Sequence, residues 1–176
     1  MDRSASQRPR ERDLPCGFFA LNEPVTFRAM TLADIDSVMA IERSSFTYPW
    51  SLRFFLQEFQ TQCSRAVVAE IRGKIAGYVL FWLLPDAVDV HNIAVHTEFR
   101  RRGIGRALLQ QVVSQARERG SVRVTLEVRR SNFPAQRLYD SLGFLTTGIR
   151  KGYYSDDGED AFAMALELGK EPSKLG

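Results

Sequence analysis

The sequence contains few of the residues that bind metals or form disulfides. Its 176 residues include two cysteines, Cys16 and Cys63, and two histidines, His91 and His96. Zinc sites need several such side chains at short, recurring spacings, and because none recurs here we predict no metal. Disulfides form mainly in exported proteins, and since the chain shows no export signal we expect both thiols to stay reduced.

Long hydrophobic runs are also absent. The longest, residues 78–85, is far shorter than the roughly 20 residues that a membrane-spanning helix needs. Residues 1–24 contain no apolar core of signal-peptide length. We therefore expect a soluble, cytoplasmic protein with no membrane partner. The 44% of apolar residues is enough to fill the core of one domain, and we expect residues 1–24 to be a disordered extension before it.

Lysine is scarce, whereas arginine is abundant and concentrated in one segment. Of the 24 basic residues, 20 are Arg and 4 are Lys. Residues 100–137 hold ten Arg and two acids, Glu118 and Glu127, although the net charge of the whole chain is +3. The guanidinium group suits forked hydrogen bonds to phosphate or carboxylate. The segment therefore indicates a site for a large anion.

The spacing of hydrophobic residues predicts two helices, a hairpin, and then alternating strands and helices. The elements expected are helices at 31–44 and from residue 51, strands at 66–71, 75–84 and 88–95, a helix at 104–119, a strand at 122–128, a helix at 132–142, and strands at 144–151 and 160–168. The strand, helix, strand order across 88–128 implies a parallel pair. We predict a mixed α/β sheet with helices packed on it.

Residues 100–106, Arg-Arg-Arg-Gly-Ile-Gly-Arg, are the most informative motif. Gly103 and Gly105 let the backbone approach a ligand, and a helix that begins there leaves its first N–H groups free to bind phosphate. A nucleotide-triphosphate loop would need Gly-Lys-Ser/Thr where Leu108 and Leu109 stand. A dinucleotide fold would need glycine or alanine at Leu108 and a second half, for which the chain after Val128 is too short.

The loop and its neighbours resemble the GNAT acetyltransferases. Arg100, Gly103 and Gly105 match the pyrophosphate loop of that family. Matching segments surround the loop: Asn92-Ile93-Ala94-Val95, Leu126-Glu127-Val128-Arg129, Asn132, and residues 41–51, 137–144 and 150–166. Together they make residues 25–168 similar to one branch, the bacterial ribosomal-protein-alanine N-acetyltransferases (RimI type). Residues 1–24 and the tail at 169–176 lie outside the resemblance.

The resemblance implies a fold and an acetyl-CoA site. The fold would have about seven mostly antiparallel strands, about four helices, and a parallel central pair that splays apart where acetyl-CoA binds. The residues expected to contact acetyl-CoA are Ile93, Ala94, Val95, Arg100, Arg101, Arg102, Gly103, Ile104, Gly105, Arg106 and Asn132. Asn132 also suffices as a helix N-cap.

Two residues would carry the chemistry that the resemblance implies. Glu127 would be the general base for the incoming amine, and Tyr139 would protonate the departing thiolate. The alternatives are that Glu127 is an exposed carboxylate paired with Arg123 or Arg129, and that Tyr139 only packs under the sheet. Neither cysteine lies in a matched motif, so we expect the amine to attack the thioester directly in a ternary complex.

The acceptor is less defined by the sequence. The resemblance points to the N-terminal alanine of a small-subunit ribosomal protein, and Tyr153 and Tyr154 are candidate acceptor-binding residues. Four nearby acids could line a groove for a basic peptide or form only a polar turn: Asp156, Asp157, Glu159 and Asp160. Other protein N-termini, an internal lysine or a small amine are alternative acceptors. An RNA-binding module is a further alternative, but the arginines lack interleaved aromatics, so we expect no specific nucleic acid.

Overall fold

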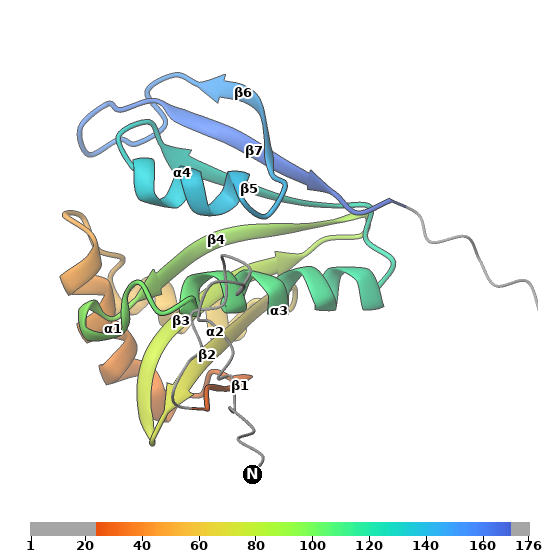
Figure 1. Ribbon diagram of the computed structural model, residues 1–176. Coiled ribbons are helices and arrows are strands. Elements are labelled where there is room, and N and C mark those ends of the chain that lie inside the picture. Colours follow the sequence, from red (N-terminus) through yellow and green to blue (C-terminus); the bar gives the residue numbers. More distant parts are fainter. Residues whose placement is uncertain (1–23, 170–176) are drawn as a thin grey trace, which may run out of the picture.

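One seven-stranded mixed sheet organises residues 24–169, the part of the chain that the computed structural model describes (Figure 1). The strands are β1 (Thr26–Ala29), β2 (Ser64–Ile71), β3 (Lys74–Leu83), β4 (Ala87–Val95), β5 (Arg123–Arg129), β6 (Leu145–Arg150) and β7 (Ala161–Glu167). Their order in the sheet is β1-β2-β3-β4-β5-β7-β6, and every neighbouring pair is antiparallel except β4 and β5. The mixed sheet and its central parallel pair confirm the expected fold class.

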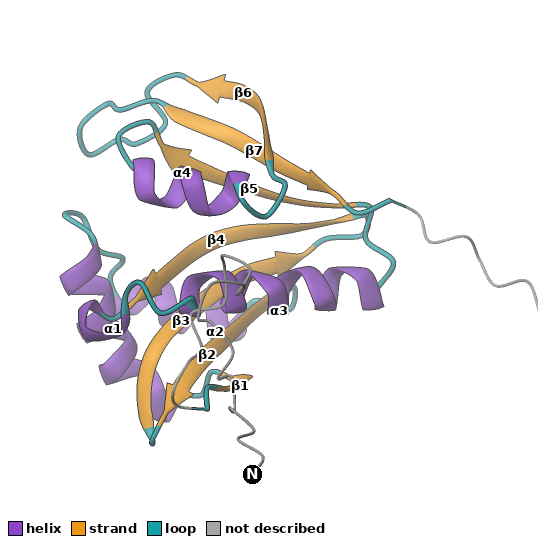
Figure 2. Cartoon of the chain, in the orientation of Figure 1, coloured by secondary structure: helices purple, strands orange, loops and turns teal. Residues whose placement is uncertain are grey.

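Helices cover both faces of the sheet (Figure 2). They are α1 (Ile35–Ser45), α2 (Leu52–Gln60), α3 (Ile104–Glu118) and α4 (Phe133–Asp140). Leu108 and Val112 of α3 pack with Val79 and Val90 in one buried cluster, which also takes in Tyr139 of α4. A second cluster on the opposite face joins α1 and α2 to the first half of the sheet. Helices α1 and α2 do not extend over β5–β7. On their side of the sheet, the end formed by these three strands is therefore left open.

Local sequence accounts for most element boundaries. Arg72 and Gly73 form the two-residue turn between β2 and β3 with φ of 50° and 75°, the positive values that a tight hairpin turn of this twist requires. Ser51 caps α2 by accepting the N–H of Phe54. Strand β1 was not expected from the sequence, because it is only four residues long, lies at the sheet edge and shows little burial. Cys16 and the expected disordered extension lie almost wholly in residues 1–23, outside the described residues.

A buried carboxylate ties α1 to the sheet. Glu42 is 1% exposed and accepts hydrogen bonds from the Trp50 N–H at 2.7 Å, from the Tyr78 hydroxyl, and from the Asn92 amide at 3.3 Å. Burial raises the pKa of Glu42, and the three hydrogen bonds act in the opposite direction. The network fixes the loop between α1 and α2 against β3 and β4.

Candidate active site

Strands β4 and β5 pair at their beginnings and then separate. The parallel ladder runs from Ala87 opposite Arg123 to Val90 opposite Leu126 and ends there, although both strands continue. Figure 1 shows the two strands diverging from right to left, with α4 and β5–β7 on one side of the opening. The backbone groups of β4 that point toward β5 beyond Val90, in the segment that includes Ile93, Ala94 and Val95, therefore have no strand partner on that side. The expected splay is present.

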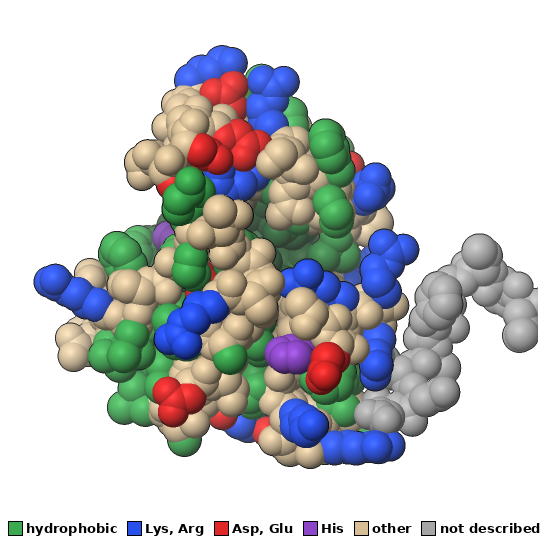
Figure 3. Space-filling view, turned by 90° about the vertical axis from the view of Figure 1, so that its left-hand side faces the viewer, with side chains coloured by type: hydrophobic (Ala, Val, Ile, Leu, Met, Phe, Trp, Pro, Cys, Tyr) green, Lys and Arg blue, Asp and Glu red, His purple; other side chains and the backbone are tan. Residues whose placement is uncertain are grey.

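The open end of this splay faces the viewer in Figure 3. The view shows a hollow lined largely by hydrophobic side chains, between the part of the molecule that contains β5–β7 and the part below it. Lys and Arg side chains lie beside the hollow. An extended ligand with an apolar arm and an anionic end would match this combination of surfaces.

The arginine-glycine loop leads into α3 at the edge of the splay. Gly103 is the N-cap of α3 with φ of 81°, and Arg101 has φ of 64°, so the loop holds two left-handed residues. The N–H groups of the first turn of α3, from Ile104 to Arg106, have no helical carbonyl to bind. A Cβ at Gly105 would lie 3.3 Å from Leu138 on α4, which explains that glycine by close packing.

Three arginine side chains of the loop contact the protein itself. Arg100 donates from Nε to the Val95 carbonyl at 3.0 Å and from Nη2 to Ser45 at 3.1 Å. The Arg102 guanidinium lies 5.4 Å from the ring centre of Phe99. Arg106 donates from Nη2 to the Ser141 hydroxyl at 2.6 Å. These contacts tie three of the loop's side chains to neighbouring residues.

Glu127 lies on β5 on the open side of the sheet. Its side chain is 16% exposed, and its Oε1 lies 3.0 Å from Nη2 of Arg150 on β6. Neither Arg123 nor Arg129, the partners weighed from the sequence, makes this ion pair. Burial raises the pKa of Glu127, the charge of Asp89 raises it further, and Arg150 and His91 oppose the shift. A carboxylate with a raised pKa is better matched to proton abstraction near neutral pH.

Asp89 and His91 on β4 join this site, and sequence reasoning did not select them. Asp89 lies opposite Thr125 in the ladder, and its Oδ1 accepts a hydrogen bond from the Thr125 hydroxyl at 2.7 Å. His91 Nε2 lies 3.4 Å from the other carboxylate oxygen of Asp89. The His91 ring packs on Trp82 at 4.3 Å between ring centres. The sequence pattern that could have indicated these two residues is their alternation with the apolar residues Val88 and Val90.

Tyr139 projects from α4 into the core beneath the splay. The residue is 5% exposed, and its ring centre lies 5.9 Å from that of Phe144. Burial raises the pKa of Tyr139, and Tyr154 raises it further. Asn132 accepts the N–H of Ala135 at 3.2 Å and caps α4, so its N-cap role is present.

The loop between β6 and β7 is fixed by Arg129. Its guanidinium lies 3.8 Å from the ring centre of Tyr154 and forms ion pairs with Asp156, Asp157 and Glu159. Asp160 pairs instead with Lys151 at 2.7 Å and with Arg130 at 3.3 Å. All four acids therefore have internal partners, which favours the polar-turn interpretation over a groove for a basic peptide.

The ring of Tyr153 lies close to the ion pair of Glu127. The guanidinium of Arg150 is 5.5 Å from the Tyr153 ring centre, and the Tyr153 and Tyr154 ring centres are 5.1 Å apart. Burial raises the pKa of Tyr153, and the nearby charge of Glu127 adds to the shift. Burial also raises the pKa of Tyr154 to about 12. The structure thus brings Glu127, Tyr153 and Tyr154 together.

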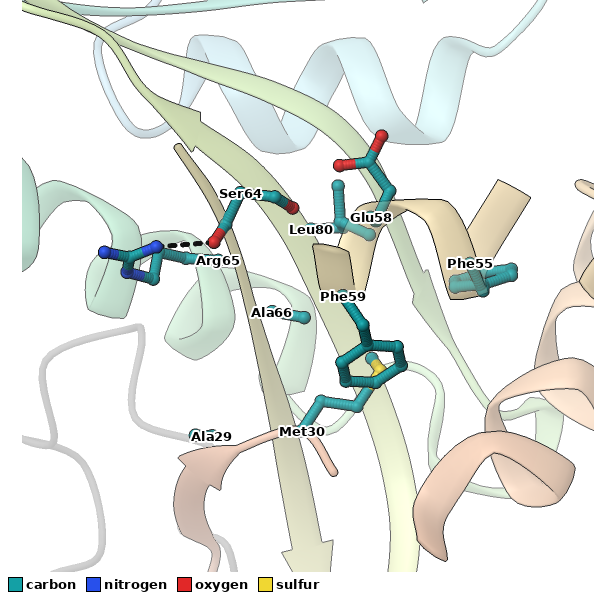
Figure 4. A pocket seen from close by; sticks show the side chains of 9 residues that line it. All are labelled: Ala29, Met30, Phe55, Glu58, Phe59, Ser64, Arg65, Ala66 and Leu80. Atoms are coloured by element: carbon teal, nitrogen blue, oxygen red, sulfur yellow. Dashed lines mark hydrogen bonds between the residues drawn. The ribbon is translucent and has the colours of Figure 1, made fainter. Parts of the chain in front are cut away.

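Other features of the described residues lie away from this site. A pocket of about 180 Å³ lies beneath α2, and Phe59 and Met30 are among the side chains that line it (Figure 4). It is bordered by β1, β2 and β3, on the far side of β4 from the splay. Residues 24–169 hold no group of three His, Cys, Asp or Glu side chains arranged for a metal ion. None of the helices in that range is long and apolar enough to span a membrane.

Comparison with known sequences adds a consistent set of similarities. The model of the Acetyltransferase (GNAT) family matches residues 35–144. An Escherichia coli K12 protein named ribosomal protein bS18-alanine N-acetyltransferase is 34% identical over 145 residues, which cover 81% of this chain and 97% of that protein. A Bacillus subtilis protein that carries the same name provisionally is 43% identical over 144 residues, covering 81% and 95%. The N-alpha-acetyltransferase RimI of Mycobacterium tuberculosis is 38% identical over 157 residues, covering 86% and 97%.

Solved structures share the same architecture. The crystal structure of the ribosomal-protein-S18-alanine N-acetyltransferase from Escherichia coli matches with a TM-score of 0.78 and 33% identity, over 87% of this chain and 99% of that chain. Arabidopsis thaliana NAA60 in complex with a bisubstrate analogue matches with a TM-score of 0.75, over 84% and 100% of the chains. Its 21% identity supports the fold alone.

Proposed function

The chain belongs to the GNAT acetyltransferase family, and we propose that it transfers the acetyl group of acetyl-CoA to the N-terminal α-amino group of a ribosomal protein that begins with alanine. The observation that carries this proposal is Glu127, a largely buried carboxylate with a raised pKa at the point where β4 and β5 part. The relatives named for ribosomal protein bS18 supply the acceptor. Such an acceptor would put the reaction in the cytoplasm.

The co-substrate proposed is acetyl-CoA, which supplies an activated acetyl thioester. GNAT acetyltransferases use this molecule, and Arabidopsis thaliana NAA60 has been crystallised with it. The residues of this chain suit it: unpaired backbone groups of β4 around Ile93 and Ala94 would bind the pantetheine arm. The backbone N–H groups from Arg101 to Arg106 at the start of α3 would hold the pyrophosphate.

Glu127 and Tyr139 would move the protons in opposite directions. The carboxylate of Glu127 would take a proton from the acceptor amine, which frees the lone pair for attack on the thioester. Tyr139 would give its phenolic proton to the departing sulfur. The raised pKa makes Tyr139 a weaker acid than a free phenol, so the proton transfer would follow or accompany cleavage of the C–S bond. No covalent acyl-enzyme is required.

A protein N-terminus is a more favourable acceptor than a lysine. An α-amine with pKa near 8 is about one-tenth neutral at pH 7, whereas a lysine with pKa near 10.4 is neutral in only a few parts per ten thousand. The difference corresponds to about 3 kcal/mol in the cost of forming the free amine. For a protein N-terminus, a single carboxylate base is therefore sufficient.

A peptide panel tests the acceptor. The protein is incubated with acetyl-CoA and short peptides that begin with Ala, Ser or Met, together with an N-terminally blocked peptide that contains one lysine. We expect transfer to the alanine peptide at least about ten times faster than to the lysine peptide, because of the difference in amine pKa. Faster acetylation of the blocked lysine peptide would refute the proposal.

A further inference from the structure

Asp89 is a partly buried carboxylate beside the proposed base that has no Lys or Arg partner. Its side chain is 26% exposed, and its hydrogen bond to Thr125 uses Oδ1. Within residues 24–169, its Oδ2 lies 3.4 Å from Nε2 of His91 without hydrogen-bond geometry, and no Lys or Arg side chain pairs with it. Partly buried carboxylates are usually neutralised by a cation. Glu127 has Arg150, but Asp89 has no such group.

His91 has a polar atom without a hydrogen-bond partner at the same place. Its Nε2 is shielded from solvent and has no hydrogen-bond partner among the described residues. The ring cannot easily turn away, because it packs against Trp82, whose indole N–H is in turn held by Glu58 of α2 at 2.7 Å. Buried polar atoms without partners are rare in folded proteins, and binding sites are one place where they occur.

The sheet register directs both residues toward Glu127. Asp89 lies opposite Thr125, so Glu127 follows two residues later on the same face of the sheet. His91 is the first residue of β4 beyond the end of the ladder and would lie opposite Glu127 if pairing continued. Its place there is set by a bulge, since Leu80 pairs with Asn92 and Phe81 with Val90.

We propose that Asp89 completes, with Glu127, a site of two carboxylates for the α-ammonium group of the incoming protein N-terminus, and that His91 positions Asp89 within it. A primary ammonium carries one positive charge and three N–H donors, which matches Oδ2 of Asp89 and the carboxylate of Glu127. The inference rests on the proposed function and specifies how its acceptor is bound. Asp89 supplies a carboxylate that binds the ammonium group, while Glu127 takes the proton before the nitrogen attacks.

The electrostatic environment of Glu127 agrees with this arrangement. The charge of Asp89 raises the pKa of Glu127, so the two carboxylates interact across the mouth of the splay. A cation bound between them would relieve their repulsion. The neighbouring charged and titratable groups are Arg150 and Tyr153, which approach Glu127 from the β6 side.

A pair of peptides isolates the contribution of the ammonium group. One has the N-terminal sequence of ribosomal protein bS18, and the other is identical but carries a propionyl group in place of the first alanine, so that it lacks the α-ammonium. Binding of each is measured by calorimetry at pH 7 in the presence of CoA, which supports no transfer. We expect the wild type to bind the first peptide at least about tenfold more tightly, as a charged hydrogen bond would give.

Asp89→Asn is the decisive variant, because it keeps the shape of the side chain and its bond to Thr125. We expect the preference for the ammonium peptide to fall to about twofold or less, while affinity for the propionyl peptide stays the same. A purely structural role would weaken both peptides equally. Asp89→Glu keeps the charge and should retain part of the preference, and His91→Phe should lose less of it than Asp89→Asn.

Asp86→Asn is the matched control. It makes the same chemical change at an exposed position in the turn before β4 and should leave the preference unchanged. An undiminished preference in Asp89→Asn, alongside normal acetylation of the peptide by the wild type, would overturn the inference and leave the proposed function intact. If the wild type neither bound nor acetylated the bS18 peptide, both the inference and the proposed function would be wrong.

Discussion

Two carboxylates on the same face of the sheet, the buried Glu42 of α1 and the half-buried Glu127 of β5, share a raised pKa but differ in what surrounds them. Glu42 accepts hydrogen bonds from Trp50, Tyr78 and Asn92, all within the fold. Glu127 has one ion pair, with Arg150, whose own side chain is 58% exposed. Burial is the largest cause of the raised pKa in both cases.

The difference separates a structural acid from one that can react. Glu42 is 1% exposed and both of its carboxylate oxygens accept hydrogen bonds from donors within the fold, so no substrate can reach it. The partner of Glu127 is a long, solvated side chain that can move away at little cost. A raised pKa alone therefore does not identify a catalytic group, and the supply of internal hydrogen-bond donors distinguishes the two.

The largest effect is expected at Glu127, which should not be replaceable without loss of activity. We expect Glu127→Gln to lower kcat by about 10²- to 10⁴-fold at pH 7, because the amide cannot accept the proton of the amine. Affinity for acetyl-CoA and thermal stability should stay close to wild type. Steady-state kinetics with the alanine peptide measure the first effect, and calorimetry measures the second.

Glu167→Gln is the control for this experiment. Glu167 is an exposed carboxylate at the end of the neighbouring strand β7, and its replacement should leave kcat unchanged. A Glu127→Gln enzyme that kept its full rate from pH 6 to 9 would show that Glu127 is not the base.

Glu42 should instead show its importance in stability. Glu42→Ala leaves three donors without an acceptor, and we expect a loss of about 3 kcal/mol in the free energy of unfolding, measured by urea denaturation. Glu42→Gln should lose less, because the amide oxygen still accepts one hydrogen bond. Near-wild-type stability of Glu42→Ala would mean that the network is not needed to hold the loop before α2.

The change of stability with pH shows in which direction the pKa of Glu42 is shifted in the folded protein. Its folded pKa lies above the unfolded value of about 4.3, so the wild type is stabilised by this group at low pH and loses that contribution as the pH rises through the folded pKa. Glu42→Gln does not titrate, so its deficit relative to wild type should shrink from pH 5 to pH 8. A deficit that grew with pH would contradict the raised pKa.

Sequence periodicity was sufficient to predict most of the fold but not the surroundings of Glu127. The helices at 104–118 and 133–140 and the parallel pair follow from alternation, capping residues and glycine stops. The partner of Glu127 depends on strand order, because β7 lies between β5 and β6. Ala163 lies opposite Glu127, and this small residue lets Arg150 reach across β7. No local pattern encodes that contact.

The residues on β4 were missed for a related reason. Asp89 and His91 alternate with Val88 and Val90 and so resemble ordinary solvent-facing positions of a strand. Their significance depends on where the ladder to β5 ends and on the bulge at His91, both of which arise from tertiary packing. The catalytic assignments of Glu127 and Tyr139 stay predictions, derived from a family resemblance and compatible with the geometry.

Replacement of Arg150 tests how its charge affects Glu127, and it should have the smallest effect of these substitutions. Its positive charge lowers the pKa of Glu127, so Arg150→Gln should raise that pKa and move the acid limb of the kcat/KM profile to higher pH. At pH 6 we expect kcat/KM to fall by about two- to fivefold, the range of an exposed ion pair, with recovery at pH 8. Lys151→Gln is the control, since Lys151 pairs with Asp160 and not with Glu127. An acid limb that moved to lower pH, or that moved equally in the control, would assign the limb to a group other than Glu127.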